Sequence, residues 1–173
     1  TSAPRGVEIT HGNLFHQAEF NQRSLGFSQH SRLVSWLPPY HDFGLISGIL
    51  NALGGGGQLF MMSPLSFIRR PFLWLEAVSS YRATHTAAPN FAFDLVVRKS
   101  TTEERSAIDL SSLDICMSAA EPIRPSTIDR FLEAFVPCGF RPQAFCPAYG
   151  LAEHTVGVTI GGRRILTVDR VCL

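Results

Sequence analysis

Short apolar runs alternate along the chain with longer stretches whose apolar side chains recur every three or four residues. The runs have the length of buried strands, and the spacing within the longer stretches is that of helices. The predicted strands cover residues 33–37, 58–62, 84–87, 113–118, 143–146 and 156–160, with a shorter one at 7–9. The predicted helices cover residues 14–26, 43–53, 72–82, 90–99 and 126–136.

Residues with strong conformational preferences stand at the ends of these elements. Thr10 or Asn13 is placed to cap the first helix. The prolines at 38–39 end the first long strand, and the glycine run at 54–57 ends the second helix. Pro71 stands where a proline opens a helix. The local chemistry therefore supports the boundaries that the apolar pattern indicates.

The alternation of strands and helices predicts the fold class. Strands joined by helices of about ten residues are typical of βαβ crossovers, in which neighbouring strands run parallel. Parallel sheets are buried by helices on both faces. We therefore predict an α/β fold, with a parallel sheet and helices on both faces. Ligands of such sheets bind beyond the carboxyl ends of the strands, so the loops that follow strands are where chemistry is expected.

Composition and charge exclude several classes of protein. Hydrophobic residues make up 45% of the 173 residues and charged residues 17%, which suits a folded domain with a real core and argues against disorder. The net charge of +1 provides no field that would attract nucleic acid. No apolar run approaches the roughly 20 residues that cross a bilayer, so no membrane span is predicted.

The cysteines and the chain ends add two expectations. The four cysteines are widely spaced, without a C-x-x-C pair, which disfavours a zinc site or a disulfide framework. Reduced thiols in a cytoplasmic protein are the simpler interpretation. The chain begins at Thr1 without a Met and ends at Leu173 without a helix cap or polar tail. We therefore expect a piece of a larger protein, truncated at both ends.

The first unusual loop follows the strand at 33–37. It places Tyr40, His41 and Asp42 between two prolines and a predicted buried helix. The prolines fix the loop, and the start of the helix offers unpaired N–H groups and a positive dipole to an anion. The alternative is that Asp42 caps the helix and His41 is a surface residue.

Two further strand ends carry residues suited to a flat ring and a phosphate. At 118–122, small residues would let a ring approach the backbone, although the segment could equally be a tight turn with Glu121 near the next helix. At 148–155, Tyr149 could cover an aromatic ligand and Glu153 could hold Mg²⁺ beside phosphates. The alternative there is a core tyrosine and a solvated glutamate.

The N-terminal segment adds groups that suit phosphate oxygens. Thr1 and Ser2 supply hydroxyl donors, and Arg5 supplies a guanidinium. The segment could equally be an ordinary turn before the strand at 7–9. None of these loops is decisive on its own.

Taken together, the four segments resemble, in order and spacing, the motifs of adenylate-forming, AMP-binding enzymes such as acyl-CoA synthetases, luciferases and non-ribosomal adenylation domains. Residues 1–7 are similar to the second half of their phosphate loop, T-G-x-P-K-G-V. Tyr40 and His41 match their aromatic–histidine motif, residues 118–122 their adenine-side turn, and residues 149–153 their Y-G-x-x-E motif. The resemblance covers nearly the whole chain.

Longer stretches resemble one subgroup, the fatty acyl-AMP ligases, at residues 35–50, 62–84, 89–99 and 135–155. The resemblance implies an enzyme that activates a fatty acid with ATP and Mg²⁺. It also implies that the acyl group passes to an acyl carrier protein, typically one that feeds a polyketide synthase. Residues 161–173 look like the beginning of an inserted segment that hinders the use of coenzyme A in this subgroup.

The resemblance implies phosphate contacts for four residues and a Mg²⁺ ligand for a fifth. Thr1, Ser2 and Arg5 would hold the β- and γ-phosphates, Glu153 would be the Mg²⁺ ligand with a catalytic role, and Thr155 would reach a phosphate oxygen. The sequence departs from the family pattern at Ser2, which replaces a glycine, and at Arg5, which replaces a lysine. The ribose-binding Asp motif, the hinge and the C-terminal lysine of the family are absent. We therefore expect residues 1–173, a partial AMP-binding domain, to be inactive alone.

The remaining implied roles concern adenine and the acyl group. Tyr149 and Gly150 of the Y-G-x-x-E motif would lie against one side of the adenine. The turn on its other side would contribute Ala119, Ala120 and Glu121. His41 would orient the acyl carboxylate as a catalytic residue. An acyl tunnel would need apolar walls, for which the candidates are Ile46, Ile49, Leu50, Phe91 and Phe93, with ordinary core packing as the alternative.

Three other functions compete with this interpretation. An acyl-CoA synthetase would carry out the same first half-reaction and use coenzyme A as acceptor. A non-catalytic adenylate-binding domain would keep the fold and bind adenylate without turnover. An unrelated Rossmann domain lacks support, because the chain has no G-x-G-x-x-G motif.

Overall fold

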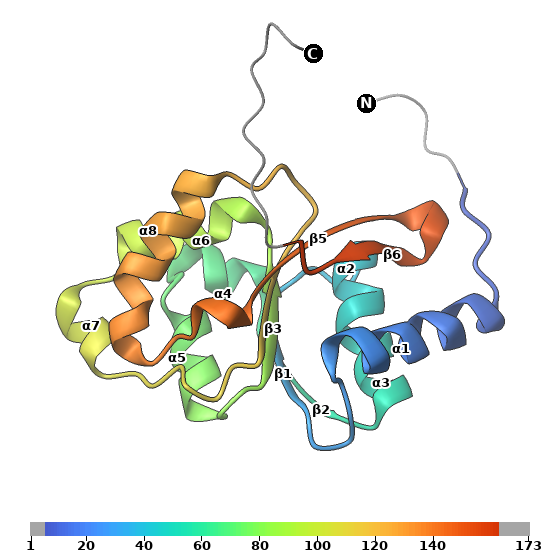
Figure 1. Ribbon diagram of the computed structural model, residues 1–173, viewed down its shortest axis with the longest axis horizontal. Coiled ribbons are helices and arrows are strands. Elements are labelled where there is room, and N and C mark those ends of the chain that lie inside the picture. Colours follow the sequence, from blue (N-terminus) through green and yellow to red (C-terminus); the bar gives the residue numbers. More distant parts are fainter. Residues whose placement is uncertain (1–5, 163–173) are drawn as a thin grey trace, which may run out of the picture.

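A six-stranded sheet separates two layers of helices in the computed structural model, which describes residues 6–162 (Figure 1). The strand order is β2-β1-β3-β4-β5-β6. The strands are β1 Arg32–Ser35, β2 Gln58–Met61, β3 His85–Ala88, β4 Ile115–Ser118, β5 Phe145–Leu151 and β6 Val156–Ile160. The strands from β1 to β5 run parallel, whereas β6 is antiparallel to β5. The predicted α/β fold is confirmed, with a mixed sheet in place of a purely parallel one.

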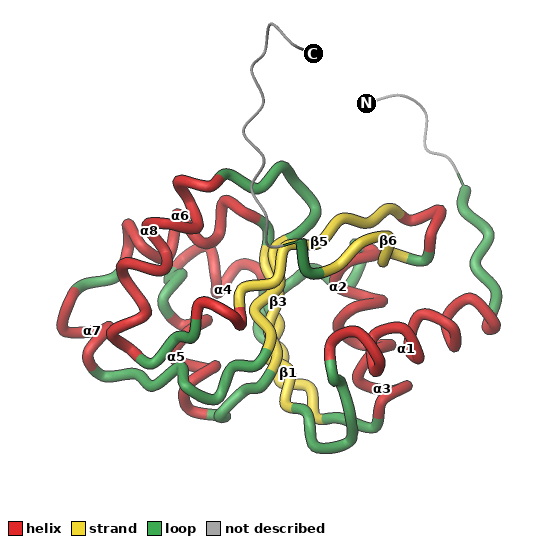
Figure 2. Tube along the Cα trace, in the orientation of Figure 1, coloured by secondary structure: helices red, strands yellow, loops and turns green. Residues whose placement is uncertain are grey.

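Helices cover both faces of the sheet, as predicted (Figures 1 and 2). One layer contains α1 His11–Leu25, α2 Asp42–Gly44, the π-helix Leu45–Leu50 and α3 Asn51–Gly55. The other layer contains α4 Pro64–Arg69, α5 Leu73–Ser80, α6 Asn90–Lys99, α7 Thr102–Ser106 and α8 Pro125–Phe135. Short 3-10 turns lie at Val136–Cys138, Pro142–Ala144 and Ala152–His154. Within residues 6–162, no helix has both the length and the apolar character needed to cross a bilayer.

Both residues proposed as caps of the first helix act together. The Thr10 hydroxyl accepts a hydrogen bond from the Asn13 backbone N–H at 3.2 Å, and the Thr10 N–H donates to Asn13 Oδ1 at 2.9 Å. This reciprocal capping box satisfies two N–H groups that the helix leaves unpaired. At the other end, Gly26 adopts φ 65°, the left-handed conformation that commonly ends a helix.

The helix predicted at 43–53 forms as one continuous helical stretch over residues 42–55, with a π-helical middle. Gly44 lets this stretch pack against the loop before it, because a Cβ at position 44 would lie 2.2 Å from the carbonyl oxygen of Pro38. The double proline and this close approach fix the path of residues 38–43. The segment that carries His41 is therefore held from both sides.

The two layers differ in how they are packed. The layer of α4 to α8 encloses the main aromatic core, in which Trp74, Phe93 and Phe131 are fully buried. On the opposite face, a smaller separate cluster of buried apolar residues contains Phe27, Leu33 and Ala52, with the partly buried Leu59 packed against it. That thinner layer leaves room for a cavity between the sheet and α1.

Several sequence predictions need correction. No strand forms at 7–9, where residues 6–10 pair with no strand of the described sheet. Strand β5 runs on to Leu151, so Tyr149 lies in a strand and not in a loop. Strand β6 is antiparallel because only a short turn joins it to β5, and a parallel crossover needs a dozen or more residues. Pro71 precedes α5 in a turn, accepting a hydrogen bond from the Trp74 N–H at 3.2 Å.

Candidate functional site

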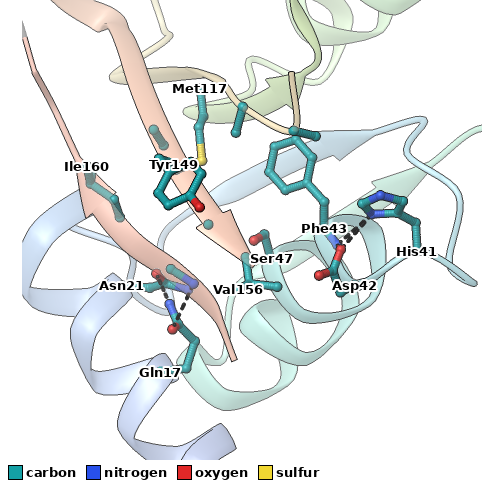
Figure 3. A pocket seen from close by; sticks show the side chains of 15 residues that line it. Gln17, Asn21, His41, Asp42, Phe43, Ser47, Met117, Tyr149, Val156 and Ile160 are labelled. Carbon is teal, nitrogen blue, oxygen red and sulfur yellow. Dashed lines mark hydrogen bonds and ion pairs between the residues drawn. The ribbon is translucent and has the colours of Figure 1, made fainter. Parts of the chain in front are cut away.

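The end of β4, strand β5 and the start of α2 converge on a cavity of about 220 Å³ (Figure 3). Side chains of α1 and β6 complete its wall. The cavity lies where ligands of parallel sheets bind, beyond the carboxyl ends of strands. The residues that the sequence predicted for the site and that line this cavity are His41, Ala119, Ala120, Tyr149 and Gly150.

His41 is the N-cap of α2. Its Nδ1 accepts a hydrogen bond from the Phe43 N–H at 3.0 Å and lies 2.7 Å from Asp42 Oδ1 (Figure 3). Asp42 Oδ1 also accepts from the Phe43 N–H, at 2.7 Å, so the two side chains share the cap that the alternative interpretation gave to Asp42 alone. Both contacts involve Nδ1. Nε2, the other ring nitrogen of this half-exposed imidazole, has no hydrogen-bond partner within residues 6–162.

The turn after β4 forms a flat wall of the cavity. Ala119 is buried, and Ala120 adopts φ 71°, a left-handed conformation that costs energy in a residue with a Cβ. Glu121 does not line the cavity, because its carboxylate accepts a hydrogen bond from the Phe91 N–H in the first turn of α6. Glu121 therefore lies at the start of α6, whereas the alternative interpretation placed it near the start of the helix that follows it, α8. Its contact with a ring stays a prediction, which this side-chain position does not favour.

Tyr149 projects from β5 into the cavity, opposite His41 (Figure 3). Its side chain is 60% exposed, so it is not the core tyrosine of the alternative interpretation. A break in the register of β5 and β6 falls between Tyr149 and Gly150. At Gly150 a Cβ would lie 1.7 Å from the carbonyl oxygen of Val156, so glycine is required there. The irregular hairpin therefore sets where the Tyr149 ring points.

Glu153 and Thr155 lie in the turn between β5 and β6 and do not line the cavity. Glu153 is exposed and forms no hydrogen bond or ion pair with the described part of the chain. Thr155 is buried and, like Val156, has a positive φ, at 53° and 82° respectively. Two consecutive left-handed residues make this turn strained, as functional turns often are.

The described residues suit a loosely held Mg²⁺ better than a dedicated metal centre. No group of three or more His, Cys, Asp or Glu side chains that could hold a metal occurs between residues 6 and 162. Mg²⁺ in phosphate-transfer sites needs only one or two carboxylates, because water and substrate phosphates supply its other ligands. The exposed carboxylate of Glu153 fits that requirement.

The remaining predicted positions fall in different places. Thr1, Ser2 and Arg5 lie outside the described residues, as does most of the segment 161–173, so their roles stay predictions. Of the tunnel candidates, Phe93 is fully buried in the main core, and Phe91 is 43% exposed beside Trp36. Ile46 and Leu50 line a second cavity, of about 340 Å³, between α1 and the helical stretch 42–55, whereas Ile49 is half-buried and lines neither cavity.

Sequence reasoning missed the contribution of α1 to the site. Gln17 and Asn21 line the cavity, although their side chains are only 5% and 3% exposed. The signal was present, since two amide residues four positions apart stand on the face of the helix that also carries Ala18 and Leu25. Their placement became visible only with the packing of α1 against α3 and β6.

A buried histidine near the site is structural. His85 Nε2 lies 3.0 Å from the Leu25 carbonyl oxygen, and Nδ1 lies 2.8 Å from the Thr84 hydroxyl. Burial lowers the pKa of His85, against a raising effect of the Leu25 hydrogen bond. A neutral imidazole in this position ties β3 to the end of α1 and leaves no group free for chemistry in the cavity.

The comparisons with known proteins agree on the family, although relatives of similar identity include both acyl-carrier-protein ligases and putative fatty-acid–CoA ligases, such as FadD21 of Mycobacterium tuberculosis, 41% identical over 166 residues and covering 91% of this chain and 28% of that protein. A family model described as AMP-binding enzyme matches residues 1–171. The chain is 42% identical over 159 residues to the medium-chain fatty acid–acyl-carrier-protein ligase JamA of Moorena producens, covering 92% of this chain and 27% of that protein. It is 37% identical over 163 residues to the corresponding ligase TtuA of Teredinibacter turnerae, covering 94% of this chain and 25% of that protein.

A solved structure agrees with these relatives. The fatty acyl-adenylate ligase from L. pneumophila, in complex with acyl adenylate and pyrophosphate, superposes with a TM-score of 0.88 and 43% identity. The match covers 91% of this chain and 28% of that one. The chain therefore spans only about a quarter of the length of the proteins it resembles.

Proposed function

Because the chain belongs to the AMP-binding enzyme family, we propose that it is part of a fatty acyl-AMP ligase. This enzyme would activate a fatty acid with ATP and transfer the acyl group to an acyl carrier protein, as the names of JamA and TtuA state for those relatives. The observation that carries the proposal is a single cavity that places His41 opposite Tyr149, with the Ala119–Ala120 wall along its side.

The reaction would take place in two parts. The first part forms the acyl-adenylate. A carboxylate oxygen of the fatty acid attacks the α-phosphorus of ATP, forming a carbon–oxygen–phosphorus linkage. The bond from that phosphorus to the oxygen bridging to the β-phosphate breaks, and pyrophosphate leaves. In the second part, the phosphopantetheine thiol of the carrier protein attacks the acyl carbonyl, a carbon–sulfur bond replaces the carbon–oxygen bond to the phosphate, and AMP leaves. The protein has little covalent chemistry to perform, so positioning and charge stabilisation supply most of the rate enhancement.

His41 would position the acyl carboxylate. Its Nδ1 is engaged by the α2 cap, which orients the imidazole and leaves Nε2 to donate a hydrogen bond to an anionic oxygen. The adjacent helix start adds the partial positive charge of its backbone N–H groups. The Asp42 carboxylate at the same cap offsets part of this positive charge, so Nε2 of His41 is the group that would bind an anionic oxygen.

The adenine would lie between Tyr149 and the turn after β4. A largely exposed tyrosine ring on a strand offers one face for stacking. Ala119 and Ala120 leave the opposite wall without bulky side chains, so a flat ring can approach the backbone. Gly150 contributes by allowing the irregular hairpin that carries Tyr149.

The phosphates would lie toward the β5–β6 turn and the N-terminal segment. Glu153 would hold Mg²⁺, which when bound would neutralise charge on the phosphate oxygens. Thr155, Thr1, Ser2 and Arg5 would donate hydrogen bonds to the same oxygens. We also propose a cytoplasmic location, because four widely spaced cysteines without a C-x-x-C pair predict reduced thiols.

A transfer assay on the intact protein tests the acceptor. The enzyme, ATP and dodecanoate would be incubated with either coenzyme A or a carrier protein bearing phosphopantetheine, and the products would be identified by mass spectrometry. The proposal requires acyl-carrier protein and no acyl-CoA. Acyl-CoA as the main product would move the protein to the acyl-CoA synthetases. Bound adenylate without either product would indicate a non-catalytic binding domain.

A further inference from the structure

Three buried amides form a directed chain beside the candidate site. The Gly157 N–H donates to Gln17 Oε1 at 3.3 Å, Gln17 Nε2 donates to Asn21 Oδ1 at 3.0 Å, and Asn21 Nδ2 donates to Asn51 Oδ1 at 3.1 Å. Each of the three amide side chains is more than nine-tenths buried. The chain links β6, α1 and α3, three elements that are far apart in the sequence.

This amide chain stands between two cavities. Gln17 and Asn21 line the site cavity of about 220 Å³ and also the second cavity of about 340 Å³. Ile46 and Leu50 line the second cavity and not the first. Figure 3 shows Gln17 and Asn21 bonded to each other at the α1 side of the site. Their side chains thus form a wall that the two cavities share.

The wall is held firmly in place. A Cβ at position 157 would lie 2.8 Å from Gln17 Nε2, so the absence of a side chain at Gly157 lets the amide approach the strand. A Cβ at Gly54 would lie 3.0 Å from that of Ala18, so α1 and α3 pack closely on either side of the Asn21–Asn51 bond. Moving Asn21 would break two buried hydrogen bonds, which is costly in a low-dielectric interior.

The wall is also chemically unsuited to contact with a hydrocarbon end. A methyl group pressed against bonded amides gains no hydrogen bond, and displacing them would leave buried polar groups unpaired. The site cavity alone is smaller than the roughly 300–1,000 Å³ of typical ligand pockets. The second cavity, which shares Gln17 and Asn21 with the site, could take the end of a longer acyl chain, because Leu14, Ile46 and Leu50 give it an apolar wall beside its polar residues His11 and Glu19.

We propose that Gln17 and Asn21 form a partition that limits the length of the acyl chain by closing the site cavity from the second cavity. This inference rests on the proposed function, since it concerns the fatty acid of that reaction. Asn21 is the better residue to test, because its side chain bonds both Gln17 and Asn51. These residues are specificity determinants and take no part in the chemistry.

The test measures kcat/KM for fatty-acid-dependent ATP–pyrophosphate exchange by the intact protein, over saturated acids from hexanoate to hexadecanoate. Asn21→Ala should raise kcat/KM for acids slightly longer than the wild-type optimum by about tenfold, relative to kcat/KM for the optimal acid. This factor is the lower end of what one methylene group contributes in a hydrophobic pocket. Gln22→Ala is the matched control, because Gln22 is an exposed amide on the same helix that lines only the second cavity. Its chain-length profile should equal that of the wild type.

A second substitution tests whether the longer acids use the second cavity. Adding Leu50→Phe to Asn21→Ala fills the second cavity and should return the profile to shorter acids, whereas Leu50→Phe alone should not change it. If Asn21→Ala fails to fold, Asn21→Ser is the alternative, because its hydroxyl can still bond Gln17. It should shift the chain-length profile in the same direction, toward longer acids, by a smaller amount.

The outcomes separate this inference from the function on which it rests. A uniform loss of activity over all acids in both Asn21 variants would show that the amide chain is structural only and would overturn the partition. Exchange by the wild type with an unchanged profile in the variants would overturn it equally. An absence of exchange with every acid in the wild type would instead remove the proposed function.

Discussion

The Val156 carbonyl approaches Gly150 across the β5–β6 hairpin so closely that a Cβ at position 150 would lie 1.7 Å from its oxygen. The close approach coincides with the break in strand register beside Tyr149. The chain reaches this geometry through positive φ values at Thr155 and Val156. Backbone strain and the absence of one side chain thus place the ring that we assign to adenine binding.

Gly150→Ala should therefore disable the site. The added methyl group collides with backbone, which cannot yield as a flexible side chain can, so the hairpin must open and carry Tyr149 away from His41. We expect a loss of nucleotide binding together with a destabilisation of about 1–3 kcal/mol. Isothermal titration with ATP and a thermal melt of the intact protein measure the two effects. Gly162→Ala is the matched control, because nothing lies within 4 Å of a Cβ there; equal ATP affinity in both variants would contradict the assignment.

The stacking role of Tyr149 predicts different effects for two substitutions. Tyr149→Phe keeps the ring and should leave the KM for ATP nearly unchanged. Tyr149→Ala removes it and should raise the KM for ATP by roughly 2–10-fold, which corresponds to the 0.5–1.5 kcal/mol of an aromatic pair. Steady-state kinetics of adenylate formation measure both. If Tyr149→Phe were as impaired as Tyr149→Ala, the hydroxyl and not the ring face would be the important group.

Glu121 should matter for the stability of α6 more than for nucleotide binding. Its carboxylate accepts from the Phe91 N–H, at a helix whose N-cap, Pro89, forms no side-chain cap. Glu121→Ala should lower local stability by about 0.5–2 kcal/mol, and Glu121→Gln, which keeps an acceptor oxygen, should lower it less. Hydrogen exchange followed by mass spectrometry on peptides from α6 measures this. A large rise in the KM for ATP with unchanged exchange would instead support the adenine contact predicted from the sequence.

Asp94 gives the layer of α6 and α8 a dependence on pH. Burial raises the pKa of Asp94, but hydrogen bonds from Arg130 and Thr127 outweigh this effect and hold it below its usual value. A folded pKa below the unfolded one contributes stability that is present above the unfolded pKa and is lost as pH falls through the folded pKa. Because the pair is partly exposed, the contribution should stay below about 1 kcal/mol.

Asp94→Asn tests that linkage. At neutral pH the variant should show faster hydrogen exchange in α6 and α8 than the wild type, after correction for intrinsic rates. Near pH 2.5, below the roughly 3.9 expected for an unfolded Asp, the difference should shrink toward zero. If the exchange rates of Asp94→Asn and the wild type differed equally at both pH values, the shape of the Asp94 side chain and not its charge would stabilise this layer.

Local signals in the sequence determined most of the fold. Helix α6 follows the predicted range of 90–99 because its apolar period and its ends agree. Helix α7 was missed because, apart from its Thr101–Glu104 capping box, it buries no side chain and so leaves no apolar period. The antiparallel direction of β6 depends on the length of one turn, which alternation alone does not reveal.

The sequence predicted the site residues that belong to a motif, but it did not predict those that only the packing of distant elements brings to the site. His41 and the alanine turn meet Tyr149 in one cavity because the first two follow strands and Tyr149 lies in the C-terminal half of β5, all at the same edge of the sheet. Gln17 and Asn21 come from a helix that precedes the sheet in the sequence. Their part in the site depends on how α1 packs on α3 and β6, a long-range arrangement that local patterns do not specify.

The most direct test of the central claim is ATP–pyrophosphate exchange by the intact protein, with fatty acids from octanoate to hexadecanoate. Wild-type protein should exchange only when a fatty acid is present. His41→Ala and Glu153→Ala should each reduce the rate by at least about tenfold, as expected for the loss of groups that stabilise developing charge. Exchange with no fatty acid of the series, or fatty-acid-dependent exchange that persists unchanged in both variants, would contradict the account.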